Sequence, residues 1–123
     1  MNPKLQEFFH AVLKQDIPLL KKRLHEVSIS DIDLALALCI DDDCRESFKV
    51  ISTRLEKNSK DNGVHLQECI GENRFEILKM LIPYCDTRMC MSLPFRTAMI
   101  VENLEIAEYL IPFSDPEIVR EYL

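Results

Sequence analysis

The sequence of 123 residues contains little glycine, with 2 Gly and 6 Pro, and it has no low-complexity run. Tight β-hairpins depend on glycine in their turns, so an all-β fold is not expected. Hydrophobic residues make up 47% of the chain, which is enough to build a core. The length is that of one ordinary domain. Together these features favour a single helical domain over residues 1–123.

Long hydrophobic runs are absent as well. No apolar stretch approaches the roughly 18 residues that a membrane span needs. Residues 1–7 lack the apolar segment of a secretory signal. The five cysteines are an odd number, which argues against a disulfide framework. We therefore expect a cytoplasmic protein with reduced thiols and no membrane contact.

Basic residues are scarce in the second half of the chain. The whole sequence carries 15 Lys and Arg against 21 Asp and Glu, a formal net charge of −6. Residues 61–123 alone hold five basic and eleven acidic side chains. An acidic surface repels phosphate groups, so nucleic acid is not an expected partner. The charge favours a partner protein with a basic surface.

What the sequence does contain is an internal repeat. The segment 75–86 recurs 29 residues later as 104–115, with six of twelve positions identical. Four segments share apolar residues at positions one, three, four and eight, and they begin at Ile17, Phe48, Phe75 and Leu104, with steps of 31, 27 and 29 residues. Such self-similarity is typical of arrays in which stacked units share one core.

Hydrophobic periodicity predicts four helix pairs and one terminal helix. The pairs cover about 3–27, 31–56, 63–83 and 92–112, and the terminal helix covers 116–123. Capping residues mark the predicted starts: Asn2-Pro3, Asp16, Asp31, Ser92, Asn103 and Asp115-Pro116. Asn62-Gly63 has the composition of a turn, and residues 83–91 are expected to form a loop.

Residues 72–82 and 102–111 resemble the inner half of an ankyrin repeat. The likeness is clearest over 63–115. The Thr-Pro-Leu-His start of the family's first helix is absent, and Asn73 and Glu102 stand where the family has a turn glycine. The repeats are also shorter than the usual length of about 33 residues. The resemblance implies an all-α fold, with stacked antiparallel helix pairs forming an ankyrin-like solenoid with trimmed finger loops.

The same resemblance implies a non-catalytic module that binds another protein on its concave face. It would act by occlusion or scaffolding, as an inhibitor or regulator of an enzyme or as a host-directed effector, and an effector would work in the cytoplasm of a host cell. Carried onto this chain, the concave face gives the following partner-binding residues: His65, Arg88, Met89, Met91, Phe95 and Arg96. Methionine and arginine are enriched in interface cores. The alternative for Met89 and Met91 is that they fold under the next helix pair.

A small Cys/His hydrolase or a zinc-binding protein is a second interpretation. Cys39 and Cys44 are five residues apart, as are Cys85 and Cys90, and His65 and Cys69 are spaced to share a helix face. No His pair follows, and no glycine-rich loop accompanies the thiols. The run 41–43 lacks the alternating spacing of a calcium loop. We therefore predict no catalytic residue, no metal ligand and no cofactor.

A structural homo-oligomer is the third interpretation. Repeat arrays need a terminal unit with a polar outer face. The last predicted helix is short and ends in Tyr122 and Leu123. Apolar residues at the open end of a stack would form an association surface, most simply in a two-fold homodimer.

Overall fold

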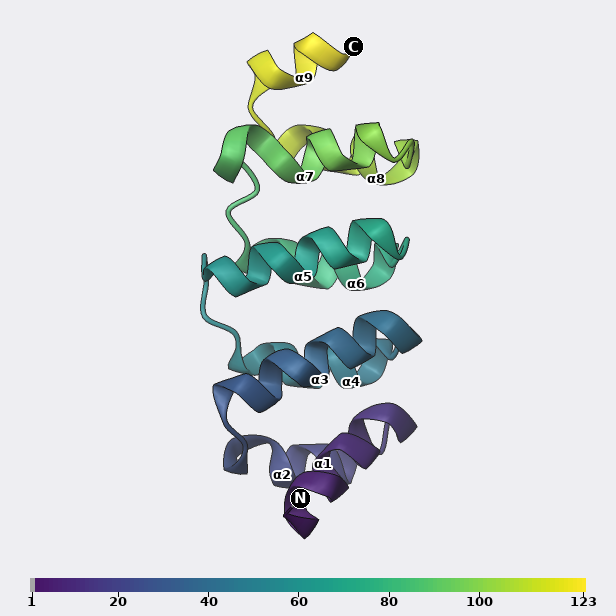
Figure 1. The fold of residues 1–123 in the computed structure, drawn as a ribbon, viewed down its shortest axis with the longest axis vertical. Helices are drawn as coiled ribbons and strands as arrows, with labels where there is room; N and C mark the ends of the chain where they lie inside the picture. The colour runs from purple at the N-terminus through teal and green to yellow at the C-terminus, as the bar shows by residue number, and fades with distance from the viewer. Residues whose placement is uncertain (1) are drawn as a thin grey trace. The chain divides into compact units, whose positions relative to one another are not determined.

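A computed structural model describes residues 2–123, and over this range the chain forms helices and no β-strand (Figure 1). The prediction of an all-α fold is confirmed. The chain divides into two compact units, of which the first ends at Glu56 and the second runs from Lys57 to Leu123. Within residues 2–123 no helix combines the length and the apolar composition required to cross a membrane.

The first unit contains two long helices, each followed by a short one. Its elements are α1 (Pro3–Lys14), α2 (Ile17–Arg23), η1 (Leu24–Glu26), α3 (Ile29–Asp42), α4 (Arg45–Ile51) and η2 (Ser52–Arg54), where η marks a 3₁₀ helix. α1 packs against α2 and α3, and α4 packs against α2 and α3. The core between them is fully buried and includes Phe8, Leu20, Leu36 and Phe48.

The second unit repeats this order and adds a terminal helix. Its elements are α5 (Lys60–Gly71), α6 (Phe75–Leu81), η3 (Ile82–Tyr84), α7 (Met89–Ile100), α8 (Leu104–Leu110), η4 (Ile111–Phe113) and α9 (Pro116–Tyr122). α5 packs against α6 and α7, while α7 also packs against α8 and α9. In Figure 1, α5 and α7 lie in front of α6 and α8.

The turn from each long helix to its short helix contains one non-glycine residue with left-handed backbone conformation. These residues are Gln15 (φ 53°), Asp43 (φ 56°), Asn73 (φ 57°) and Glu102 (φ 61°). The N–H of the next residue donates to the carbonyl five residues earlier, and these pairs are Asp16–Ala11 at 2.9 Å, Cys44–Cys39 at 2.9 Å, Arg74–Cys69 at 2.8 Å and Asn103–Ala98 at 2.9 Å. This bonding satisfies carbonyls that a helix end otherwise leaves unpaired.

The register predicted for the second segment is wrong by three residues. The short helix begins at Arg45, not at Phe48, and Phe48 takes the fourth position that Leu20 and Leu78 take in theirs. Polar residues in this helix hid the pattern. Ser47 is buried, and its Oγ donates to the carbonyl of Val12 at 2.7 Å. A buried hydroxyl with a bonded carbonyl replaces an apolar side chain at modest cost.

Four predicted caps are present: Asn2 Oδ1 accepts from Lys4 N at 2.8 Å, Asp16 Oδ1 from Leu19 N at 3.4 Å, Asn103 Oδ1 from Ile106 N at 3.2 Å and Asp115 Oδ1 from Glu117 N at 2.9 Å. Asp31 is a correction. Ser28 is the cap of α3, and Asp31 Oδ2 accepts from Ser28 N at 3.2 Å in a reciprocal pair. The cap, and with it the start of the helix, therefore lies three residues earlier than predicted.

The second unit contains three further corrections. Asn62-Gly63 lies inside α5, where the buried Asn62 donates from Nδ2 to the carbonyl of Tyr84 at 2.9 Å. The predicted loop 83–91 is corrected mainly at its start, where η3 extends to Tyr84. α7 is assigned from Met89, but Cys90 and Met91 have left-handed backbone angles and are not part of its right-handed turns. Ser92 does not cap its own helix, since its Oγ accepts from the N–H of Asp115 at 2.9 Å.

Candidate functional site

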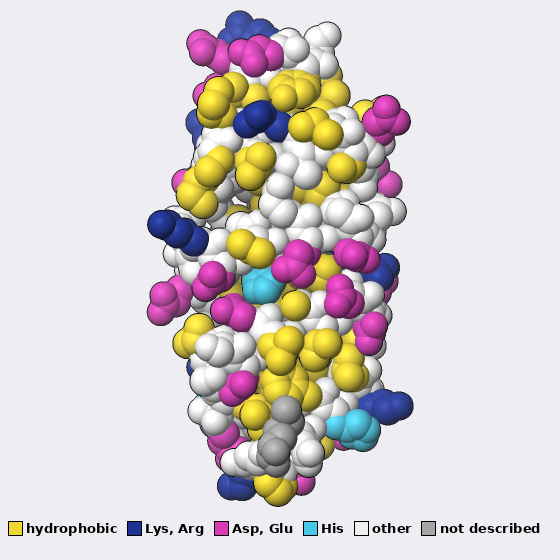
Figure 2. All heavy atoms as spheres, viewed as in Figure 1, with side chains coloured by type: hydrophobic (Ala, Val, Ile, Leu, Met, Phe, Trp, Pro, Cys, Tyr) yellow, Lys and Arg dark blue, Asp and Glu magenta, His cyan; other side chains and the backbone are white. Residues whose placement is uncertain are grey.

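An apolar groove with a volume of ≈ 220 Å³ lies between α5 and α7. Its lining comprises Lys60, Gly63, Val64, Leu66, Gln67, Asp86, Met89, Cys90, Leu93 and Pro94. Three apolar side chains on its wall reach solvent, namely Val64, Met89 and Leu93. On the face shown in Figure 2, hydrophobic side chains gather over α7 with charged side chains beside them.

Two features of the sequence shape this groove. Gly63 has no side chain, and a Cβ at this position would lie 4.0 Å from Cε of Met89. A methyl group there would make an ordinary van der Waals contact with Met89, so glycine leaves only this small space unfilled. Gln67 Nε2 donates to Thr97 Oγ1 at 2.7 Å, which ties α5 directly to α7. The buried Leu66 and Pro94 complete the lining between the helices.

The start of α7 is a left-handed turn of three consecutive non-glycine residues. Cys90, Met91 and Ser92 have φ values of 55°, 60° and 57°. This conformation costs about 1–2 kcal/mol for each such residue, so the surrounding structure must hold it. The turn leaves the side chain of Met91 65% exposed.

Three hydrogen bonds hold this turn. Ser92 N donates to the carbonyl of Arg88 at 3.0 Å, and Arg96 Nη1 donates to the carbonyl of Cys90 at 3.3 Å. The N–H of Asp115 donates to Ser92 Oγ, as described above. Arg88 itself is exposed, and its N–H donates to Asp86 Oδ1 at 3.2 Å. The turn is therefore fixed from α7 and from the cap of α9.

Of the six predicted partner-binding residues, some lie at or beside the groove and the others support the fold. Met89 lines the groove, while Arg88 and Met91 lie exposed beside it. The half-buried Arg96 donates from Nε to the Tyr122 hydroxyl at 3.3 Å in addition to its bond with Cys90. Its guanidinium therefore supports the left-handed turn and α9.

Phe95 and His65 are corrections, because both side chains belong to the core. Phe95 is 0% exposed, and its ring packs edge-on against Tyr122 with centroids 5.8 Å apart. Equivalent fully buried positions in the other long helices are Phe8, Leu36 and Leu66. His65 is 5% exposed, and its Nδ1 lies 3.5 Å from Glu68 Oε1. Neither side chain is available to a partner in this structure.

Val64 and Leu93 line the groove, and neither was among the predicted partner-binding residues. The buried positions of α5 are Asn62, His65, Leu66, Cys69 and Ile70. Val64 falls between the first two of these and does not share their face. This mismatch with the helical period was the available signal for an exposed valine. Leu93 precedes Pro94 where the left-handed turn ends, and no sequence pattern marked that turn.

Cysteines occupy the places of small core residues. Cys39 and Cys69 accept the turn hydrogen bond at the same helix position as Ala11 and Ala98, and all four are 0% exposed. Burial raises the pKa of Cys69 to about 12. The pKa of Cys39 is also raised, mainly by burial, with smaller contributions from Cys44 and Asp42. Both groups are neutral thiols at pH 7, and a neutral thiol is a poor nucleophile and metal ligand.

Cys85 and Cys90, the other pair of cysteines five residues apart, differ in their exposure to solvent. Cys85 Sγ lies 3.4 Å from the carbonyl of Leu81 and 3.6 Å from that of Asn62, and burial raises its pKa to about 12. Among residues 2–123, no three or more His, Cys, Asp or Glu side chains are grouped so that they could hold a metal ion. Cys90 is the exposed thiol among the five cysteines.

The predicted association surface at the chain end is small. Ile118 and Val119 are buried, and Tyr122 packs against Phe95 and accepts the Arg96 hydrogen bond. Leu123 remains 80% exposed. Tyr122 thus helps to cover α7, whereas Leu123 stays exposed at the chain end.

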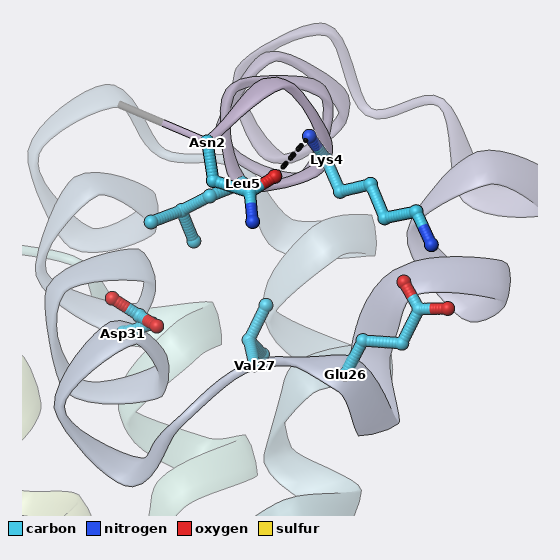
Figure 3. A pocket seen from close by; sticks show the side chains of 6 residues that line it. All are labelled: Asn2, Lys4, Leu5, Glu26, Val27 and Asp31. Atoms are coloured by element: carbon cyan, nitrogen blue, oxygen red, sulfur yellow. Dashed lines mark hydrogen bonds between the residues drawn. The ribbon is translucent and has the colours of Figure 1, made fainter.

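A separate pocket of ≈ 310 Å³ opens in the first unit (Figure 3). Its lining comprises Asn2, Lys4, Leu5, Glu26, Val27 and Asp31. Asn2 Oδ1 and Asp31 Oδ2 accept the capping bonds described above. In Figure 3 the amine of Lys4 points toward the carboxylate of Glu26. Leu5 and Val27 give this pocket some apolar surface, but less than the α5–α7 groove has.

Comparisons of the chain with protein-family models, with curated proteins and with solved structures find no match.

Proposed function

We propose that the chain is an ankyrin-like array of helix pairs that binds another protein through the α5–α7 groove and catalyses no reaction. The recurring order of long helix, left-handed turn, short helix and 3₁₀ helix supports the array. The left-handed residues Asn73 and Glu102 stand where the ankyrin family has a turn glycine. The observation that carries the binding function is the open apolar groove of Val64, Met89 and Leu93.

The size and lining of the groove favour an amino-acid side chain as its occupant. Its ≈ 220 Å³ is smaller than the roughly 300–1,000 Å³ of small-molecule sites. The polar lining residues Lys60, Asp86 and Gln67 surround an apolar wall. A protein that inserts one apolar anchor between α5 and α7 would match this arrangement, and such anchors dominate binding energies.

The net negative charge of the second unit indicates that the partner has basic residues around its apolar anchor. The unit from Lys57 to Leu123 carries seven Lys and Arg against eleven Asp and Glu. A partner with basic residues around its apolar anchor would be steered to this unit and would associate faster at low salt. Because Met91 lies on a turn that is already held by hydrogen bonds, the entropic cost of ordering this segment on binding is small. The partner would be either an enzyme that the chain occludes or a host factor that it recruits.

A photo-crosslinking experiment tests this function. A benzophenone amino acid replaces Met91 beside the groove, or Glu121 on α9 as a control, and the protein is irradiated in an extract of its native cell. We expect the Met91 position to give a discrete crosslinked partner that mass spectrometry identifies, and the Glu121 position not to give it.

The partner so identified is then titrated with two matched variants. Val64 and Ile100 are both exposed apolar residues, but Val64 lines the groove and Ile100 does not. Val64→Glu should weaken binding at least about tenfold, because a carboxylate would be desolvated in the contact. Ile100→Glu should leave the affinity unchanged. Equal affinities for Val64→Glu and the parent would refute the groove as the binding site.

The catalytic and metal alternatives find less support. A hydrolase built on Cys69 and His65 would need a thiolate, whereas burial keeps the Cys69 thiol neutral at pH 7. Thiol titration with a coloured reagent gives an independent test. We propose that Cys90 reacts rapidly in the native protein and that the buried thiols react only on unfolding.

A further inference from the structure

A row of three aromatic rings lies on α6, α8 and η4, away from the groove. The Phe75 and Tyr109 centroids are 5.3 Å apart with an interplanar angle of 75°, and those of Tyr109 and Phe113 are 5.6 Å apart at 47°. All three side chains are half-buried. Each ring therefore contributes to packing and still presents part of its surface to solvent.

One end of this row already holds a cation from the same chain. Lys79 Nζ lies 4.3 Å from the Phe75 centroid and 5.8 Å from the Tyr109 centroid. Glu76 Oε1 lies 3.3 Å from the same ammonium. A ring face within about 6 Å attracts a cation through its quadrupole, and the carboxylate adds its charge. An ammonium held by rings and an acid is thus an observed arrangement on this surface.

The other end of the row repeats these groups around a shallow pocket of ≈ 470 Å³. Its lining comprises Glu105, Glu108, Tyr109, Pro112 and Phe113. The two glutamates are exposed, and no basic side chain is part of the lining. Tyr109 belongs to both ends, so the pocket combines two rings with two uncompensated carboxylates.

We propose that this pocket, the aromatic–acidic shelf, binds an arginine or lysine side chain of a basic partner segment. The guanidinium would stack on Tyr109 or Phe113 while Glu105 and Glu108 accept its hydrogen bonds. Arginine suits the shelf better than lysine, because its planar group stacks on rings and donates to two acceptors at once. The acidic balance of residues 57–123 favours the same occupant. This is a second contact surface, and it does not depend on the groove.

A peptide titration followed by NMR tests the proposal. The probe is acetyl-Gly-Arg-Arg-Gly-amide, and the control peptide carries citrulline in place of arginine, which keeps the shape and removes the charge. The arginine peptide should shift the amide signals of Glu105, Glu108, Tyr109 and Phe113, and the shifts should diminish with added salt. The citrulline peptide should leave these signals in place.

Two pairs of variants make the test specific. Glu105→Gln with Glu108→Gln should weaken binding of the arginine peptide at least about threefold, since two charge-assisted bonds are lost. Glu117→Gln with Glu121→Gln removes the same charge from α9 and should have no comparable effect. Tyr109→Leu should weaken binding about two- to fivefold, the range of an exposed cation–π contact. Val64→Glu should leave peptide binding intact, which separates this surface from the groove.

Several results would overturn the proposal. Equal shifts with the arginine and citrulline peptides would show that the cation is not recognised. Equal losses for the α8 and α9 glutamate pairs would indicate diffuse attraction to an acidic protein. Saturable binding of choline chloride at the shelf without binding of the arginine peptide would assign the shelf to a small quaternary amine.

Discussion

Individual residues in this chain adopt backbone conformations that glycine adopts more easily. Gln15, Asp43, Asn73 and Glu102 all have positive φ at the turn between a long and a short helix. Two of them compensate with side-chain bonds: Gln15 Oε1 accepts from Glu46 N at 2.9 Å, and Asn73 Oδ1 accepts from Asn103 Nδ2 at 2.9 Å. These bonds link neighbouring helix pairs, so glycine at either place would remove a contact.

Glu102→Gly should stabilise the protein, because the exposed side chain of Glu102 is fixed at a φ of 61°. Relief of the left-handed conformation is worth about 1–2 kcal/mol, and the greater freedom of unfolded glycine takes back about 0.5–1 kcal/mol. We expect a net gain of about 0.5–1 kcal/mol in urea denaturation. Glu102→Ala removes the same side chain but keeps the penalty, so it is the control. A stabilisation by alanine equal to that by glycine would contradict the backbone explanation.

At the scale of the element, the left-handed turn at the start of α7 links the groove to α9. Arg96 connects both, through the carbonyl of Cys90 and the hydroxyl of Tyr122. Arg88 is exposed two residues before Cys90 and donates its backbone N–H to Asp86. The two arginines, which the sequence assigned to one binding surface, therefore have different physical roles.

Arg96→Ala should lower the free energy of unfolding by about 1–2 kcal/mol, because two hydrogen bonds are lost at a half-buried site. Arg88→Ala should change it by less than about 0.5 kcal/mol, as is usual on the surface. Urea denaturation measures both. Tyr122→Phe removes one of the two bonds, and its effect should be smaller in an Arg96→Ala background than in the parent. Equal destabilisation by the two arginine variants would mean that Arg96 does not hold the turn.

The elements that the sequence predicted well are fixed by hydrogen bonds between residues that are close together in the sequence. The caps Asn2, Asp16 and Asn103 accept hydrogen bonds from N–H groups two or three residues away, so the local sequence is enough to locate them. The errors involve distant partners. Asn62 resembles a turn residue but bonds to Tyr84, and Ser47 looks polar but is buried against Val12.

The residues of the candidate site also divide into those that the sequence indicated and those that depend on distant contacts. Met89 and Met91 stand out as apolar residues outside the repeated core pattern, and the structure places them at or beside the groove. Phe95 was assigned to the surface although the place it takes on its helix is buried in every long helix. The left-handed turn depends on Arg96 and on the cap of α9, and such convergence of separate segments has no local signature.

At the scale of the whole molecule, buried thiols make stability depend on pH. Burial raises the pKa of Cys69 and of Cys85 to about 12, and it also raises that of Cys39 and of Cys44. An unfolded thiol ionises at about 8.5. Below that pH both states hold the proton, and the contribution of the thiols to stability is fully present. Above it the unfolded state loses the proton first, so the free energy of unfolding falls as pH rises toward about 12.

We expect urea denaturation to report a progressive loss of stability from pH 8.5 to pH 10.5, to which each buried thiol adds at most about 1.4 kcal/mol per pH unit. Other groups titrate in this range, so the difference between parent and Cys69→Ala is the informative quantity. Alanine already occupies the equivalent positions 11 and 98, so the variant should fold. Its decline should be shallower than that of the parent, whereas Cys90→Ser, at an exposed thiol, should follow the parent. If the free energy of unfolding of Cys69→Ala instead changes with pH in parallel with that of the parent, the Cys69 thiol has the same pKa in the folded and unfolded states. That result would contradict its burial in the core.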